Sequence, residues 1–99
     1  MENTKEIIDD MTIKQVGLIL TDKPMNVHAA PGARIFKYPG LDNVYIMEND
    51  LYGNVMPAHC CFLAFQGKKG MIGKQLKIAT LRSYTQKQIK SMVASNSNG

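Results

Sequence analysis

Acidic residues are absent from the second half of this chain, because all eight lie at or before Asp50. Residues 1–50 hold five lysines and arginines beside these acids, and residues 51–99 hold seven, so the halves carry −3 and +7 within a net charge of +4. Such an asymmetry indicates a partner for the basic half. Nucleic acid, DNA or RNA, is the candidate that needs no motif, because neutralised phosphates give affinity by themselves.

The basic side chains of the second half are therefore the predicted phosphate contacts. They are Lys68, Lys69, Lys74, Lys77, Arg82, Lys87 and Lys90, with Tyr84 as a further candidate. Two simpler interpretations of the same charges stay open. The acidic half could fold against the basic half, or the lysines could form an ordinary solvated face.

Long apolar runs and a leader are also missing. The longest apolar runs span about ten residues, and a membrane-spanning helix needs roughly twenty. The first ten residues carry four acids and one lysine, which is the wrong charge for a signal peptide. The two cysteines are then expected as free thiols in a reducing compartment, namely the cytoplasm of a cell or of an infected host.

Catalytic and metal-binding patterns are incomplete, and no motif identifies a family. A tetrahedral zinc site would have to bring the adjacent His59, Cys60 and Cys61 together with the distant His28, without any C-x-x-C spacing. A Cys61 nucleophile paired with His59 on one face of a strand is disfavoured, because apolar neighbours raise a thiol's pKa. We predict no catalytic residue, metal or cofactor, and no enzymatic activity.

A glycine-rich segment resembles a phosphate-binding loop only superficially. Five residues rather than four separate Gly67 from Gly73, and Gln75 replaces the Ser or Thr that holds magnesium. The same segment is better interpreted as a basic hairpin tip that reaches phosphates without recognising bases.

The chain length and composition predict one domain over residues 1–95, followed by a disordered tail over 96–99. Apolar residues make up 44% and charged residues 20%, as in globular proteins. The low charge and seven methionines favour an oligomer, although a monomer with a methionine-rich core fits as well.

The first third of the chain predicts a helix over residues 2–11, with Asn3 and Glu6 as its capping box. Residues 12–20 fit either a strand or a second helix in which Gly17 is a defect. Residues 21–32 contain two prolines and no apolar period, so they are predicted to be a loop.

Strands are predicted over residues 33–38 and 43–49, joined by a type II turn at Pro39-Gly40. A turn over residues 50–54 follows, with Gly53 or Asn54 at positive φ. Residues 67–70 form another turn, and a strand is predicted over 71–81.

A helix is predicted to close the domain over residues 83–95. Ser83 or Thr85 caps it, with Gln86 or Gln88 completing a capping box. The apolar side chains Ile89, Met92 and Val93 are expected to pack inward, with the lysines of this helix facing outward.

The uncharged stretch over residues 55–66 is the densest apolar segment and is predicted to lie in the core. As a strand it is central and buried on both faces; as a helix it has Pro57 in its first turn and Gly67 just past its end. The hairpin context favours the strand. A helix layer or a second subunit must then cover its outer face, so we expect a homo-oligomer.

The predicted fold class is α+β, with an antiparallel meander of about four strands between an N-terminal and a C-terminal helix. Closure into a small barrel is left open. The aromatic residues Phe36, Tyr38, Tyr45 and Tyr52 either form a stacking platform for single strands or pack half-buried on the sheet.

Two classes of function follow. The first is a small non-catalytic nucleic-acid-binding module. No association with a membrane is expected. The second is a protein-interaction module, such as a small regulator, inhibitor or structural subunit of a virus or mobile element, which self-associates or binds an acidic protein surface.

Overall fold

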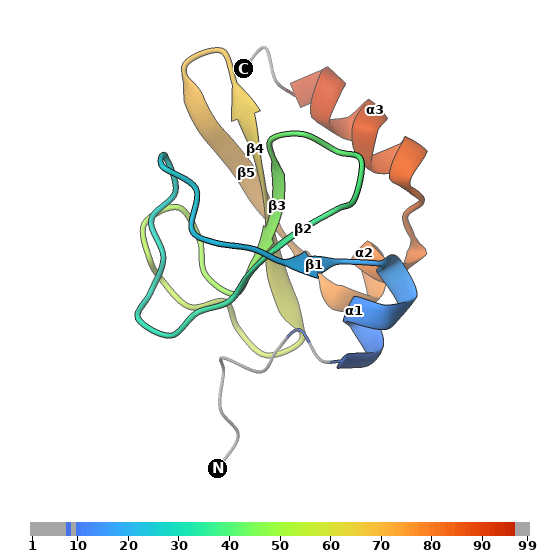
Figure 1. Ribbon diagram of the computed structural model, residues 1–99, viewed down its shortest axis with the longest axis horizontal. Coiled ribbons are helices and arrows are strands. Elements are labelled where there is room, and N and C mark those ends of the chain that lie inside the picture. Colours follow the sequence, from blue (N-terminus) through green and yellow to red (C-terminus); the bar gives the residue numbers. More distant parts are fainter. Residues whose placement is uncertain (1–7, 9, 97–99) are drawn as a thin grey trace.

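The chain folds around one antiparallel sheet (Figure 1). The structure, a computed structural model, describes residue 8 and residues 10–96. Each strand pairs with the next one in sequence, and β1 and β5 form the two edges of an open sheet. The strands are β1 (Ile19–Leu20), β2 (Ile35–Lys37), β3 (Val44–Met47), β4 (Cys60–Gly67) and β5 (Gly70–Lys77).

Within the described residues three helices accompany the sheet, namely α1 (Asp10–Val16), α2 (Ile78–Ser83) and α3 (Gln86–Asn96). Figure 1 shows all three on one side of the sheet, with the loops over residues 22–34 and 50–59 on the other. The predicted α+β class, with an antiparallel meander between terminal helices, is confirmed. The sheet has one strand more than predicted, and it does not close into a barrel.

The ambiguous segment over residues 12–20 divides into helix and strand. Helix α1 ends at Val16, and Gly17 lies just after it rather than inside it. The Leu18 N–H donates to the Ile13 carbonyl at 3.1 Å, a bond typical of a chain leaving a helix. Apart from Ile8 and the first residues of α1, the helix predicted over 2–11 lies outside the described residues, as does most of the predicted tail.

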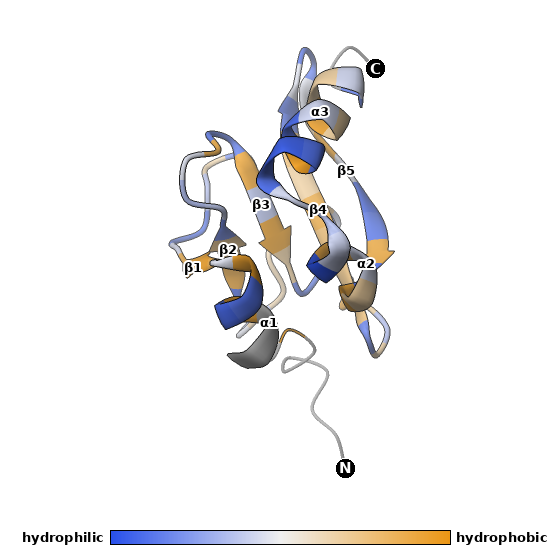
Figure 2. Cartoon of the chain, turned by 90° about the vertical axis from the view of Figure 1, so that its right-hand side faces the viewer, coloured by the Kyte–Doolittle hydropathy of each residue, from blue (hydrophilic) through white to orange (hydrophobic). Residues whose placement is uncertain are grey.

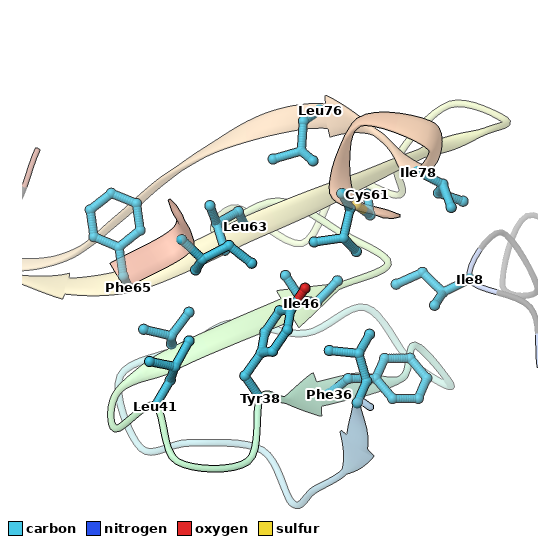
Figure 3. Packing of buried hydrophobic residues seen from close by; sticks show 14 residues of the cluster. Ile8, Phe36, Tyr38, Leu41, Ile46, Cys61, Leu63, Phe65, Leu76 and Ile78 are labelled. Carbon is cyan, nitrogen blue, oxygen red and sulfur yellow. The ribbon is translucent and has the colours of Figure 1, made fainter. Parts of the chain in front are cut away.

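Apolar side chains fill both faces of the sheet. On the side of the helices, alternate residues of β3 and β4 such as Ile46, Cys61 and Leu63 pack against helical residues including Leu81 and Ile89 (Figure 3). We call this the helical face. On the opposite or loop face, a smaller cluster comprises Val27, Ile35, Met47, Met56, Phe62 and Ala64. Loop residues of the same chain therefore cover the face for which a second subunit was expected.

The apolar stretch predicted over residues 55–66 is a strand from Cys60 onward, and the helix alternative is wrong. Its strand β4 pairs with β3 on one side and β5 on the other, which makes it central as expected. The strand begins later than predicted, because residues 57–60 form a turn in which His59 has a φ of 65°. Val55 forms only an isolated bridge with Asn49.

The strand predicted over residues 71–81 is too long. Strand β5 ends at Lys77, and Ile78 begins α2, where its N–H donates to the His59 carbonyl at 2.9 Å. Ile78 and Leu81 are both buried, because a three-residue spacing places them on one face of a helix. A strand that continued to residue 81, as predicted, would instead have placed Ile78 and Leu81 on opposite faces.

The predicted turns are confirmed. At the type II turn, the Leu41 N–H donates to the Tyr38 carbonyl at 3.2 Å, and Gly40 has a φ of 82° that suits glycine. The turn over residues 50–54 has Gly53 rather than Asn54 at positive φ. The turn over 67–70 joins β4 to β5, with Gly67 paired to Gly70.

Helix α3 has the capping box that its sequence predicts. The Gln88 N–H donates to Thr85 Oγ1 at 3.1 Å, and the Thr85 N–H donates to Gln88 Oε1 at 2.8 Å. Ile89 is buried, and Met92 and Val93 pack half-buried against the helical-face cluster, as predicted. No helix of the described residues is long and apolar enough to cross a membrane.

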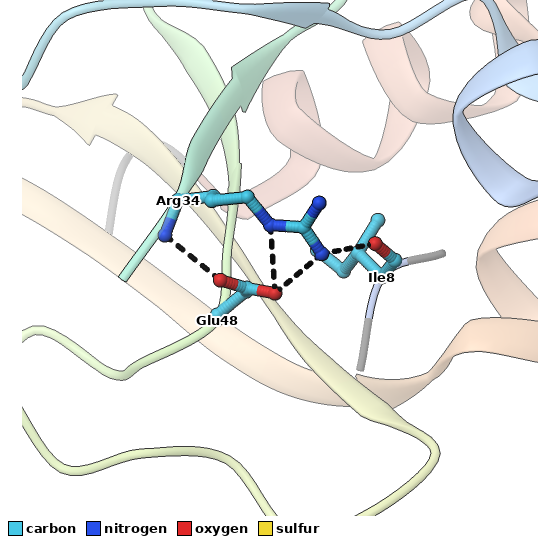
Figure 4. A network of polar contacts seen from close by, with 3 residues as sticks. All are labelled: Ile8, Arg34 and Glu48. Carbon is cyan, nitrogen blue, oxygen red and sulfur yellow. Dashed lines mark hydrogen bonds and ion pairs between the residues drawn. The ribbon is translucent and has the colours of Figure 1, made fainter. Parts of the chain in front are cut away.

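A partly buried ion pair joins the start of β2 to the end of β3 (Figure 4). The Glu48 carboxylate accepts hydrogen bonds from the Arg34 guanidinium at 2.9 and 3.2 Å and from the Arg34 backbone N–H at 2.8 Å. The guanidinium also donates to the Ile8 carbonyl, which ties Ile8 to the edge of β2. Neither residue was singled out in the sequence.

Candidate nucleic-acid interface

The seven cations predicted to bind phosphates are distributed over four elements. Lys68 and Lys69 form the tip of the β4–β5 hairpin, Lys74 and Lys77 lie on β5, and the remaining three lie on α2 and α3. All seven side chains are exposed. None of them forms an ion pair with another residue of the described part of the chain.

The acids of the first half whose side chains the structure describes do not form ion pairs with these cations. Glu48 pairs with Arg34, and Asp42 lies 3.8 Å from Lys37. Asp50 instead accepts hydrogen bonds from backbone N–H groups of its own turn. The interpretation in which the acidic half folds against the basic half therefore has no support among the described acids.

Strand register divides the cations of β5 between the two faces of the sheet. Lys74 lies opposite Leu63 and so points to the helical face, whereas Lys77 lies opposite Cys60 and points to the loop face. The seven cations do not form one flat patch. Because β5 is an edge strand, its positive charges border the free edge from both faces, as the hydrophilic stretch of β5 in Figure 2 indicates.

Of the two interpretations of the aromatic residues, packing on the sheet describes three of the four, and the stacking platform is not formed. Phe36 and Tyr38 are buried on the helical face, and Tyr45 is half-buried on the loop face. Burial raises the pKa of the Tyr38 hydroxyl to about 12, and that hydroxyl has no hydrogen-bond partner among the described residues. Tyr52 alone of the four is freely exposed, at 88%. The further candidate Tyr84 is half-buried beside the helical-face cluster.

The adjacent histidine and cysteines do not converge on one site. His59 precedes β4 in a turn, so it does not share a strand face with Cys61 as the sequence suggested. Burial, with a smaller contribution from Cys60, raises the pKa of the Cys61 thiol to about 12 and keeps it protonated at neutral pH. Over the described residues, no group of three or more potential ligands could hold a metal ion.

No family model, curated protein or solved structure matches this chain. Function is therefore inferred from the residues alone.

The segment that resembles a phosphate-binding loop is the β4–β5 hairpin, and the last of its three glycines, Gly73, has a packing role. A Cβ atom at Gly73 would lie 2.2 Å from the Leu63 carbonyl oxygen and 2.7 Å from Cε2 of Phe62. The ring of Phe62 thus occupies the space beside the bare backbone of β5. Close packing of β5, rather than phosphate binding, explains why glycine is needed at this position.

Sequence reasoning placed Tyr52 correctly in the turn over residues 50–54 but missed the position of this turn beside β5. Tyr52 lies in the turn over residues 50–54, which packs beside β5 and leaves a cavity of about 360 Å³ between them. The turn residues around Tyr52 were the signal for exposure. The approach to β5 had no signal, because it depends on tertiary packing between segments about twenty residues apart.

Proposed function

We propose that this protein is a small non-catalytic nucleic-acid-binding module that acts in the cytoplasm. The observation that carries the proposal is the set of seven exposed cations in its second half, none of which has an ion-pair partner in the described chain. Each lysine or arginine that neutralises a phosphate releases condensed counterions, and this release drives binding without sequence recognition.

The free edge of β5 is the best-supported track for a phosphate backbone. Lys68 and Lys69 lie at one end of this edge, and Lys77 lies at its other end. Between them Lys74 is reachable from the helical face, over which α3 adds Lys87 and Lys90. Contacts of this kind orient a nucleic acid but do not distinguish its bases.

Replacing Lys68 and Lys69 together with glutamine tests this function. The double variant should weaken binding to a random-sequence oligonucleotide by on the order of tenfold, and its log–log salt slope should fall by about 1.4 to 1.8. Fluorescence anisotropy over a series of salt concentrations measures both quantities. The matched control is the double replacement of the exposed Lys14 and Lys23 with glutamine, which removes the same charge from the first half.

The control should leave the affinity and the salt slope close to those of the wild type. Equal losses in the two double variants would show that only net charge matters and would reject the proposed track. Absence of wild-type binding to DNA and RNA at about 50 mM salt would reject the function itself.

A protein-interaction module is the second candidate, and the opposite edge of the sheet favours it. Ile19 and Leu20 on the edge strand β1 are 55% and 62% exposed, and an open apolar edge can accept a strand from another chain. Light scattering should then give the mass of a homo-oligomer for the wild type and of a monomer for Leu20→Lys. A monomeric wild type at high concentration would contradict self-association.

A further inference from the structure

The loop face carries a cavity of about 360 Å³ between the turn over residues 50–54 and β5. Its volume is within the range of small-molecule sites. Phe62, Met71 and Gly73 line it from the sheet, and Leu51 and Tyr52 line it from the turn. Apolar and aromatic side chains therefore share the lining with polar atoms, among them those of Asp50, and the cavity opens beside the strand edge that the cations border.

The turn that presents Tyr52 is held in one conformation by hydrogen bonds. Asp50 Oδ1 accepts the Tyr52 and Asn54 N–H groups at 2.8 and 2.9 Å, and the Asp50 N–H donates to the Asn54 carbonyl at 2.8 Å. Tyr52 is 88% exposed although its backbone is fixed. Binding then has to order only the side-chain torsions of this residue and not the turn that carries it.

The charges around the cavity select a neutral group rather than a phosphate. None of its lining residues is a cation. Partial burial raises the pKa of the Asp50 carboxyl, but hydrogen bonds from Asn54 and Tyr52 lower it by more. The net effect is a pKa below the usual range. Asp50 is thus ionised at the rim of the cavity and repels phosphate, whereas a flat, uncharged base meets an aromatic ring and apolar walls.

Cations that could bind phosphates nevertheless lie on either side of this cavity. Alternate residues of β5 point to the same face, so Lys77 shares the loop face with Met71 and Gly73. At about 3.3 Å per residue, the hairpin lysines lie on the order of 10 Å from the cavity residues of β5, and Lys77 lies about 15 Å away in the other direction. A strand running along β5 would meet positive charge before and after the cavity.

We propose that this cavity binds one base of a single-stranded nucleic acid, stacked on Tyr52, while the flanking lysines hold the adjacent phosphates. The inference rests on the proposed nucleic-acid function and narrows its ligand to single strands. In a duplex the bases stay stacked on their neighbours and cannot reach an aromatic ring on the protein surface.

Replacing Tyr52 with alanine separates this proposal from the general phosphate contacts. Tyr52→Ala should weaken binding to a single-stranded oligonucleotide by roughly 5- to 100-fold and leave binding to the matching duplex unchanged. Tyr52→Phe should retain single-strand affinity within about twofold, because the ring rather than the hydroxyl stacks. Met25→Ala is the matched control, since Met25 is 94% exposed and lies outside the cavity.

The outcomes distinguish the two levels of the proposal. If Tyr52→Ala leaves single-strand affinity unchanged while the Lys68/Lys69 variant loses affinity, the base site is rejected and the nucleic-acid function stands. Equal losses for single strand and duplex would also reject the base site. If the wild type binds no nucleic acid but binds polyglutamate in a Tyr52-dependent way, the cavity serves a peptide and both proposals fail.

Discussion

Replacing Arg34 with methionine should lower the free energy of unfolding by about 3 to 5 kcal/mol, because it leaves a buried carboxylate without its cation. The Glu48 side chain is 1% exposed, and it receives two hydrogen bonds from the guanidinium. The Arg34 side chain is 31% exposed, so the lower end of this range is expected. Urea denaturation followed by circular dichroism measures the loss.

A double-mutant cycle tests whether the loss comes from the unpaired charge. Arg34→Met combined with Glu48→Gln removes both charges, so it should be more stable than Arg34→Met alone. Lys37→Met is the matched control, because its partner Asp42 is 95% exposed and such pairs contribute about 0 to 1 kcal/mol. A double variant whose loss equals the sum of the two single losses would contradict coupling between Arg34 and Glu48.

This ion pair also marks where sequence reasoning reaches its limit. Arg34 and Glu48 are 14 residues apart, and only the antiparallel pairing of β2 with β3 brings them together. The pattern of each strand was visible, because β-branched and aromatic residues alternate between turns. The charge that β3 carries into the interior was not visible, since a glutamate at the end of a strand is ordinarily exposed.

The central strand shows the same division between pattern and position. The uncharged run over residues 55–66 predicted burial, and the two flanking hairpins predicted a strand. Pro57 and Gly67 also fitted the two ends of a helix, but pairing with β3 and β5 on either side outweighs that preference. The turn at His59, with its positive φ, left no trace in the sequence and shortened the strand.

For the candidate interface, the sequence identified the cations but could not predict on which face of the sheet each one lies. The absence of acids after Asp50 is a property of the sequence, whereas the opposite faces of Lys74 and Lys77 depend on strand register. A one-residue shift in pairing would move every side chain of β5 to the other face. The end of β5 at Lys77 was missed because Ile78 and Leu81 continue an apolar pattern that fits strand and helix alike over so few residues.

Leu63 lies in the middle of the central strand β4, and replacing it with alanine should lower the free energy of unfolding by about 2 to 5 kcal/mol. Leu63 on β4 lies opposite Ile46 on the neighbouring strand β3, and both side chains are fully buried on the helical face. Truncation removes apolar contacts and leaves a cavity that helices on one side and strands on the other cannot easily fill. Urea denaturation should show a lower midpoint, while the dependence of the unfolding free energy on urea concentration stays unchanged.

The matched control lies on the same strand. Gln66 is exposed, so Gln66→Ala should change the stability by less than about 0.5 kcal/mol. If Leu63→Ala were as stable as Gln66→Ala, the side chain of Leu63 would not lie in the core, and the register between β3 and β4 would be wrong by one residue. The same error would exchange the faces of Lys74 and Lys77 if β5 moved with β4, so this stability measurement also tests the arrangement of the proposed interface.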